Sequence, residues 1–372
     1  MSKRAILVLE DGKSFYGYYF GAEVDAEGEV VFNTGMTGYQ EICTDPSYRG
    51  QMVTLTYPLI GNYGMNREDE ESVRPWLTAL VVREYCHEFS NWRADGDLHT
   101  YLAQYGVPGM YGVDTRSLTR HLRTKGTMRA VLAAFDESVN AEELKKRAQE
   151  VTPLSEKDLV AETATSESYE LGPVVEAQGA RIVVVDCGIK RNILRSLRRR
   201  GAEMIVVPHT ASAADILELH PRGVVVSNGP GDPASLPGPV AMAQALVERR
   251  VPFLGICLGH QILGRAIGAT TSRLKFGHHG GNHPVKDISA GRVYITSQNH
   301  EFQVDRASIP EGSGFFVSHV NLNDGSVEGL EHRDVPVFSV QYHPEGCPGP
   351  QDNQYLFDKF VQMLLRYGTD VG

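Results

Sequence analysis

One cysteine stands between two glycines in the stretch GICLGHQ (255–261), directly after the apolar run VPFL. A buried structural cysteine packs like a small hydrophobic residue and needs no flanking glycine. A nucleophile on a sharp strand-to-helix turn does need them, because Gly255 and Gly259 would relieve the crowding there. A helix that begins at Leu258 would favour the thiolate of Cys257 and aim its first backbone N–H at an oxyanion. The stretch predicts a nucleophilic thiol, although a core cysteine at a tight turn also fits the motif.

A base for this thiol is indicated by QYHPEG (341–346). Pro344 favours extended backbone at His343, and residues two apart in an extended chain project to the same side, so His343 and Glu345 can touch. The apolar lead-in VPVFSV predicts a buried strand whose end presents the pair. Cys257 as nucleophile, His343 as acid and base and Glu345 as its orienting group would form a triad. Without Cys257, a surface turn would be the better interpretation of this stretch.

A third segment, SNGPGDP (227–233), follows the apolar run GVVV. It lacks the Lys-Ser/Thr pair of a P-loop and the third glycine of a dinucleotide fingerprint, so phosphate binding is not expected. Gly229 and Gly231 could bring backbone N–H groups close to a substrate or an oxyanion. A Gly-Pro-Gly turn that is selected only for its dihedral angles is the alternative.

The elements that must position these residues follow two patterns. From Ala180, the apolar runs RIVVVD, EMIVVP, GVVV and VPFLGI alternate with helical segments, which predicts an α/β domain with a mainly parallel sheet flanked by helices. The N-terminal part instead predicts a smaller α+β domain, with strands around an Asp11–Gly12 turn and a helix that starts at Asp114 or Thr115. We expect the N-terminal domain at 1–150, a linker at 151–179 and the α/β domain at 180–372.

The composition narrows the class of partner. The chain has 372 residues and a formal net charge of -10, which argues against nucleic acid or an anionic membrane as the partner. No apolar stretch reaches the roughly 18 residues of a membrane span, and the N-terminus does not read as a signal peptide. The five cysteines include no C-x-x-C pair, so we expect a reduced, cytoplasmic protein.

Two clusters receive a structural interpretation. The histidines of FGHHGGNHP, namely His278, His279 and His283, have no carboxylate or cysteine at ligand spacing, and we expect structural hydrogen bonds and no metal. The second cluster is a run of basic residues beside an apolar helix face, which predicts a solvated surface. It comprises Lys190, Arg191, Arg195, Arg198, Arg199 and Arg200.

Taken in order, SNGPGDP, GICLGHQ and QYHPEG resemble the three signature segments of class I (triad) glutamine amidotransferase domains. The N-terminal segment FNTGMTGYQEICTDPSY (32–48) and the segment KFGHHGGNHP (275–284) resemble one family within this class. That family is the small, glutamine-hydrolysing subunit of carbamoyl phosphate synthetase. The resemblance spans nearly the whole chain.

The resemblance implies Cys257, His343 and Glu345 as the catalytic triad. It also implies a glutamine-binding set, which comprises Ser47, Gly229, Gly231, Leu258, Gln261, Asn299, Glu301 and Phe302. Ser47 comes from the N-terminal domain, so the active site is expected near the domain interface. Glu301 stands where the family usually has glycine, and its carboxylate would repel an anionic group of the substrate.

The implied reaction is hydrolysis of glutamine to glutamate and ammonia through a cysteinyl thioester. The implied partner is a large synthetase subunit that binds ATP and Mg²⁺ and makes carbamoyl phosphate from bicarbonate, for arginine and pyrimidine synthesis. No cofactor is expected in this chain. Two alternatives remain: the amidotransferase subunit of another synthase, such as anthranilate synthase, and a catalytically silent scaffold for the large subunit.

Overall fold

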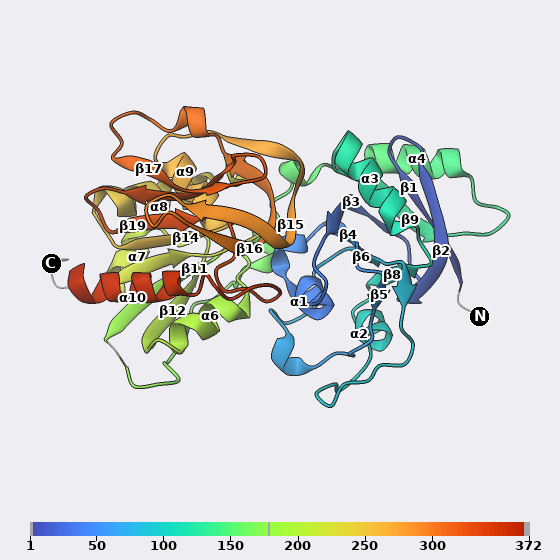
Figure 1. Cartoon of the computed structure of the whole chain (residues 1–372), viewed down its shortest axis with the longest axis horizontal. Coiled ribbons are helices and arrows are strands. Elements are labelled where there is room, and N and C mark those ends of the chain that lie inside the picture. The colour runs from blue at the N-terminus through green and yellow to red at the C-terminus, as the bar shows by residue number, and fades with distance from the viewer. Residues whose placement is uncertain (1–2, 178, 368–372) are drawn as a thin grey trace. The chain divides into compact units, whose positions relative to one another are not determined.

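The computed structural model describes residues 3–177 and 179–367, and the chain divides into two compact units (Figure 1). The first unit contains the chain up to Lys157 together with residues 275–280. The second unit contains residues 158–274 and the chain from Gly281 onward. The chain therefore returns to the first unit for six residues after most of the second unit has been formed.

The first unit is built on a closed barrel of seven strands in the order β1-β2-β8-β6-β4-β3-β9. The barrel strands are β1 (Arg4–Leu9), β2 (Ser14–Gly21), β3 (Ala26–Asn33), β4 (Gln51–Leu55), β6 (Ala79–Val81), β8 (Pro108–Tyr111) and β9 (Met128–Ala134). A two-stranded ribbon of β5 (Leu59–Ile60) and β7 (Glu84–Tyr85) lies outside it. The predicted turn at Asp11–Gly12 is confirmed, since β1 and β2 pair in antiparallel register across it.

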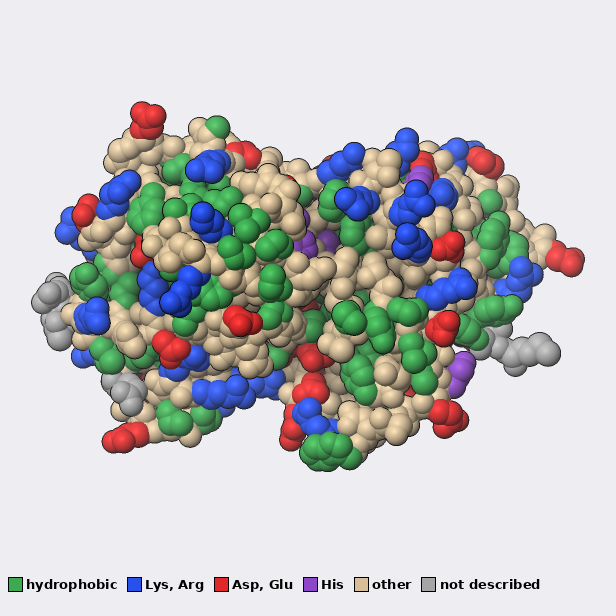
Figure 2. All heavy atoms as spheres, viewed as in Figure 1, with side chains coloured by type: hydrophobic (Ala, Val, Ile, Leu, Met, Phe, Trp, Pro, Cys, Tyr) green, Lys and Arg blue, Asp and Glu red, His purple; other side chains and the backbone are tan. Residues whose placement is uncertain are grey.

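Helices cover this barrel. They are α1 (Tyr39–Thr44), α2 (Leu98–Gln104), α3 (Thr115–Lys125) and α4 (Ala141–Glu150). Helix α3 begins where the sequence predicts, because the Asp114 carboxylate accepts the Ser117 N–H as an N-cap. Its buried Leu118 and Leu122 face the barrel core, while Lys and Arg side chains gather over it in Figure 2. Phe276, from the returning segment, stacks on Phe32 of β3 at 5.8 Å between ring centroids.

The second unit contains a ten-stranded mixed sheet in the order β10-β12-β11-β13-β14-β19-β18-β17-β15-β16. Its strands are β10 (Tyr169–Leu171), β11 (Ala180–Asp186), β12 (Ala202–Pro208), β13 (Gly223–Val226), β14 (Phe253–Ile256), β15 (Thr271–Asp287), β16 (Arg292–Val304), β17 (Phe315–Asn321), β18 (Val327–His332) and β19 (Val337–Val340). The run β12-β11-β13-β14-β19 is parallel, which confirms the predicted core of the domain. Antiparallel pairing of β19 with β18 and of β18 with β17 extends the sheet beyond this core.

Helices cover both faces of the parallel strands, which explains their near-continuous apolar runs. The helices of the unit are α5 (Val160–Thr163), α6 (Arg191–Arg198), α7 (Ala213–Glu218), α8 (Pro237–Glu248), α9 (Leu258–Ala266) and α10 (Tyr355–Tyr367). Ile182 and Val184 of β11 share one buried cluster with α6 and α10. Val183 and Val185, on the opposite face, share another with α7, α8 and α9. Both faces of β11 are therefore buried from Ile182 to Asp186.

The segment 151–179, which we predicted as a linker, carries structure of its own. Strand β10 pairs with β12 in antiparallel register and thereby forms one edge of the second unit's sheet. Thr165, before this strand, donates its backbone N–H to the Asp186 carboxylate at 2.9 Å. Within the described residues, no helix combines the length and the apolar character that a bilayer crossing requires.

Candidate active site

Cys257 lies on a strained turn between β14 and α9. Its φ of 54° and ψ of -104° lie outside the regions that non-glycine residues normally adopt, and its side chain is only 2% exposed. Both flanking glycines are required by close backbone approaches. A Cβ on Gly255 would lie 2.5 Å from the Gly259 carbonyl oxygen, and one on Gly259 would lie 2.1 Å from that of Val226. The turn is therefore a nucleophile elbow, as the glycine spacing predicts.

Parallel pairing of β14 with β19 brings the proposed base to the same edge of the sheet. Ile256 pairs with Val340, and the Cys257 N–H donates to the Val340 carbonyl at 2.9 Å. Beyond β19, the His343 Nδ1 and the Glu345 Oε1 lie 2.7 Å apart, with both side chains buried. The predicted contact between His343 and Glu345 is thus present in the structure.

The electrostatics of this pair favour the charged forms of both side chains. Burial alone would lower the pKa of His343, but the charges of Glu345 and Cys257 together raise it to about 10. Burial would likewise raise the pKa of Glu345, but the charges of Lys190 and His343 lower it to about 2. Glu345 therefore stabilises the imidazolium that forms when the ring takes a proton from a thiol.

The second ring nitrogen of His343 is the one available to the thiol. Because Nδ1 contacts Glu345, proton exchange must use Nε2, which has no hydrogen bond of good geometry among the described residues. The Cys257 thiol is near enough to contribute to the raised pKa of His343. Its Sγ points at the Asn299 carbonyl oxygen, 3.5 Å away. A small rotation of the thiol would redirect it, as is common before a substrate binds.

Lys190 lies in the candidate site, although the sequence analysis assigned it to a solvated surface. We predicted a solvated basic surface, but Lys190 is 1% exposed, and its Nζ lies 3.0 Å from the Glu345 Oε1 and 2.7 Å from the Gly346 carbonyl oxygen. Lys190 is the N-cap residue of α6, just after β11, and not part of the helix's outer face. Its place after the carboxyl end of a parallel strand was the available signal, since such ends line the sites of open α/β sheets.

One backbone N–H next to Cys257 is left without an acceptor in the described part of the chain. The Gly259 N–H donates to the Ser227 carbonyl at 3.1 Å, whereas the Leu258 N–H has no hydrogen-bond acceptor among the described residues. Leu258 is the first residue of α9, so this N–H is positioned as the predicted oxyanion donor. Gly229 approaches another backbone closely, because its Cβ would lie 2.0 Å from the Cys187 carbonyl oxygen. Gly231 adopts a φ of +90°, which favours glycine.

Strand β16 brings three of the predicted glutamine-binding residues beside the triad. The His343 N–H donates to the Ser297 carbonyl at 2.9 Å, and this links the histidine to the strand. Asn299 contacts Cys257 through its carbonyl, as described above. The Gln261 Nε2, from α9, donates to the carbonyl of Phe302 at 2.9 Å. These contacts place the segment 297–302 directly alongside the elbow.

The negative charge of Glu301 is paired in the structure. Its Oε2 lies 2.9 Å from the Nη2 of Arg273 on β15, and the carboxylate is 7% exposed. The sequence analysis treated this carboxylate as a lone negative charge that would repel the substrate. The ion pair supplies a partner that no spacing rule indicates, since 28 residues separate the two.

Two further sets of residues from the sequence analysis belong to the first unit. Ser47 belongs to the first unit, where its N–H donates to the Asp45 carboxylate at 2.9 Å. His278 and His279 are buried in the returning segment of that unit, and the His279 carbonyl accepts the Thr34 N–H at 3.2 Å. Cys347, a second thiol four residues after His343, accepts a hydrogen bond from the Asn192 side chain at 3.1 Å.

The fold and the elbow with its histidine–glutamate pair are the features of class I glutamine amidotransferases, and the model of that family, "Glutamine amidotransferase class-I", matches residues 183–363. A second family model, "Carbamoyl-phosphate synthase small chain, CPSase domain", matches residues 7–132. The chain belongs to the carbamoyl phosphate synthase small chain family.

Similar proteins support this assignment over almost the full length. The carbamoyl phosphate synthase small chain of Symbiobacterium thermophilum is 51% identical over 96% of this chain and 98% of its own length. That of Bacillus caldolyticus is 48% identical over 97% of this chain and 96% of its own length. The pyrimidine-specific small chain of Bacillus subtilis is 47% identical over 96% and 95%, respectively. The resemblance that the three motifs and the N-terminal segment indicate is confirmed.

Proposed function

We propose that this chain hydrolyses the side-chain amide of L-glutamine to glutamate and ammonia, with Cys257, His343 and Glu345 as its catalytic triad. The observation that carries the proposal is the strained elbow at Cys257, which lies beside the buried His343–Glu345 pair. A strained backbone at a buried cysteine costs free energy, and such strain is found mainly at functional sites. The family assignment supports a catalytic role for this cysteine. We propose that the substrate is held by Gly229, Gly231, Leu258, Gln261, Asn299, Phe302 and, from the first unit, Ser47.

The proposed chemistry has two stages. The Cys257 sulfur attacks the amide carbon, His343 takes the thiol proton, and the oxyanion accepts the Leu258 N–H. His343 then gives that proton to the leaving nitrogen, so ammonia departs and a thioester remains. In the second stage His343 removes a proton from water, which attacks the thioester. Glutamate leaves, and the proton returns to the sulfur.

The ammonia needs a second active site. The relatives are named small chains, which supports a large synthetase subunit as the partner of this chain. We propose that ATP and Mg²⁺ bind to that subunit and that it converts bicarbonate and the delivered ammonia to carbamoyl phosphate. The five cysteines are all free, in agreement with a reducing compartment such as the cytoplasm.

The deciding experiment uses Cys257→Ala in the complex with the large subunit. Removal of the nucleophile should reduce glutamine-dependent carbamoyl phosphate synthesis by several orders of magnitude, as is usual for a triad. Synthesis from added ammonia should stay near the wild-type level, because it needs no thiol. Loss of both activities in an assembled complex would refute the proposed division of labour, and retention of both would make the chain a scaffold.

The matched control is Cys347→Ser. Cys347 has no glycine elbow and follows the histidine instead of preceding a helix, and its sulfur contacts Asn192. We expect this variant to retain glutaminase activity. If it is inactive while folded and Cys257→Ser is active, the nucleophile has been assigned to the wrong thiol.

A further inference from the structure

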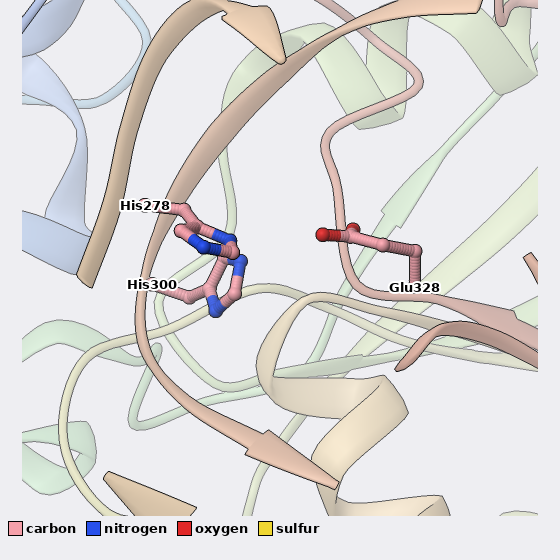
Figure 3. A group of neighbouring side chains, drawn as sticks. All are labelled: His278, His300 and Glu328. Carbon is pink, nitrogen blue, oxygen red and sulfur yellow. The ribbon is translucent and has the colours of Figure 1, made fainter. Parts of the chain in front are cut away.

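A buried polar network lies behind the substrate-binding segment of β16. Side chains two residues apart in a strand project from the same face, so Gln298 and His300 share one face while Asn299 projects from the other. Gln298 is 1% exposed and His300 is 6% exposed. Glu328, on β18, is completely buried and points toward His300 in Figure 3. The third side chain drawn there, His278, belongs to the first unit.

The Glu328 carboxylate fixes the orientation of the Gln298 amide. Its Oε2 accepts the Gln298 Nε2 at 2.9 Å, and its Oε1 accepts the Asn321 Nδ2, also at 2.9 Å. An ionised carboxylate can only accept hydrogen bonds, so the amide nitrogen of Gln298 must face Glu328. The amide oxygen of Gln298 consequently faces the other way, toward the Nε2 of His300, 2.8 Å away.

These contacts define the protonation of His300. Its Nδ1 lies 2.7 Å from the Phe302 carbonyl oxygen, which is an acceptor, so Nδ1 carries a proton. Its Nε2 faces the Gln298 amide oxygen, which is also an acceptor, so Nε2 carries one as well. The ring is therefore doubly protonated, and the Glu328 carboxylate, which has an oxygen within 4.8 Å of a ring nitrogen of His300, supplies the compensating negative charge.

The network ends at the substrate-binding segment. The Phe302 carbonyl accepts both the His300 Nδ1–H and the Gln261 Nε2–H, so this oxygen joins β16 to helix α9 of the elbow. A charged donor holds the carbonyl more firmly than a neutral one. Loss of the charge on His300 would loosen the segment 297–302 relative to α9.

We propose that Glu328 is a positioning residue for the substrate-binding strand: through the Gln298 amide it holds His300 in its doubly donating form and thereby fixes the Phe302 carbonyl against helix α9. Glu328 contacts no reacting atom in this scheme. The kinetic consequence rests on the proposed glutamine hydrolysis, whereas the protonation of His300 does not.

The test exchanges the carboxylate for an amide of the same shape. In Glu328→Gln, the new amide oxygen faces Asn321, whose Nδ2 keeps donating because its Oδ1 accepts the Asn323 N–H at 2.9 Å. The new amide nitrogen then faces Gln298. We expect the Gln298 amide to turn over, to give up its 3.1 Å hydrogen bond to the Thr296 Oγ1 and to present its own nitrogen to His300. The Nε2 of His300 must then accept a hydrogen bond, and the ring becomes neutral. We expect the ¹⁵N NMR signal of His300 Nε2, in full-length chain with labelled histidine, to change from protonated to unprotonated. A His300→Gln variant assigns the signal.

The kinetic expectation is a rise of about tenfold in the KM for glutamine with kcat little changed, since the lost charge-assisted hydrogen bond serves substrate binding. Glu331→Gln is the matched control, because Glu331 lies on the same strand but does not belong to this network. Its Oε1 pairs instead with the Lys359 Nζ at 2.7 Å. It should leave both the His300 signal and the KM unchanged.

A double variant distinguishes positioning from simple stabilisation. Combining Glu328→Gln with Gln298→Glu moves the carboxylate directly beside His300, where it can accept a hydrogen bond from the protonated Nε2. The protonated NMR signal and the low KM should both return. The proposal is overturned if Nε2 stays protonated in Glu328→Gln, or if the double variant remains neutral at His300. Failure of the proposed function would instead appear as absence of glutamine hydrolysis in the wild type, with the NMR result unaffected.

Discussion

Lys190 shows how a single residue can support a catalytic group without touching the substrate. Its ammonium compensates the buried Glu345 carboxylate at 3.0 Å, and Glu345 in turn orients His343. Removing one partner of a buried pair is costly because the other charge remains without compensation. Loss of Lys190 should therefore lower the stability of the fold and also disturb the orientation of His343 in the proposed triad.

We predict that Lys190→Gln lowers the free energy of unfolding by about 3–5 kcal/mol, the usual cost of a broken buried ion pair. Urea denaturation monitored by circular dichroism measures this loss. Arg147→Gln provides the comparison, because Arg147 pairs with Asp25 and Glu27 where all three side chains are well exposed. That variant should lose no more than about 1 kcal/mol. Equal losses would mean that Lys190 is not the compensating charge for Glu345.

Glu301 gives a second prediction at this scale. Its carboxylate is paired with Arg273, so the glutamine should meet little of its charge. We expect Glu301→Gly to leave the KM for glutamine similar or to lower it, in steady-state glutaminase assays. A large increase in KM would show that the carboxylate itself binds substrate, for instance at the α-ammonium group. Arg273→Gln should then have the opposite effect, since it would expose the carboxylate.

At the scale of the element, the elbow depends on how closely β13, β14 and α9 approach one another. We predict that Gly259→Ala destabilises the protein by about 1–3 kcal/mol and greatly reduces glutaminase activity, because its Cβ would overlap the Val226 carbonyl and push α9 away. Gly238→Ala is the control, since no atom lies within 4 Å of a Cβ at that position of α8. Thermal unfolding should show a small gain for the control, from improved helix propensity.

The elements near the site differ in how far the sequence determines them. The elbow, the strand before His343 and the parallel core were predictable, because apolar runs and paired glycines are local signals. The partners of Glu345 and Glu301 were not, because Lys190 and Arg273 are brought to them only by the tertiary fold. Strand β18, which carries Glu328, also escaped prediction, since SVEGLEH alternates too weakly and its pairing with β19 depends on the sheet.

The whole molecule should respond to acid through two buried histidines. Burial lowers the pKa of His260 to about 3 and that of His319 to about 4. Between pH 6.5 and pH 4 the unfolded chain therefore binds more protons than the folded one at these positions, so stability falls as the pH falls. The slope is up to ~1.4 kcal/mol per pH unit for each histidine. His343, whose pKa is raised, is protonated in both states over this range and adds no slope.

We predict that His260→Gln flattens this dependence by up to ~1.4 kcal/mol per pH unit. Urea unfolding at several values between pH 4 and pH 7 measures the slope directly. The exposed His87 serves as the control, and His87→Gln should leave the slope unchanged. An unchanged slope in His260→Gln would mean that this side chain is protonated inside the folded protein.

The returning segment 275–280 limits how the chain can be divided into modules. Its Phe276 stacks on Phe32, and the carbonyls of Lys275 and His279 accept backbone hydrogen bonds from the barrel. A fragment that stops at Lys157 would lack these six residues, and a fragment that starts at Asp158 would carry them without their packing partners. In the sequence, a segment of the first unit is thus inserted within the second unit. Exchange of either unit between relatives by a single crossover would separate residues that must be inherited together.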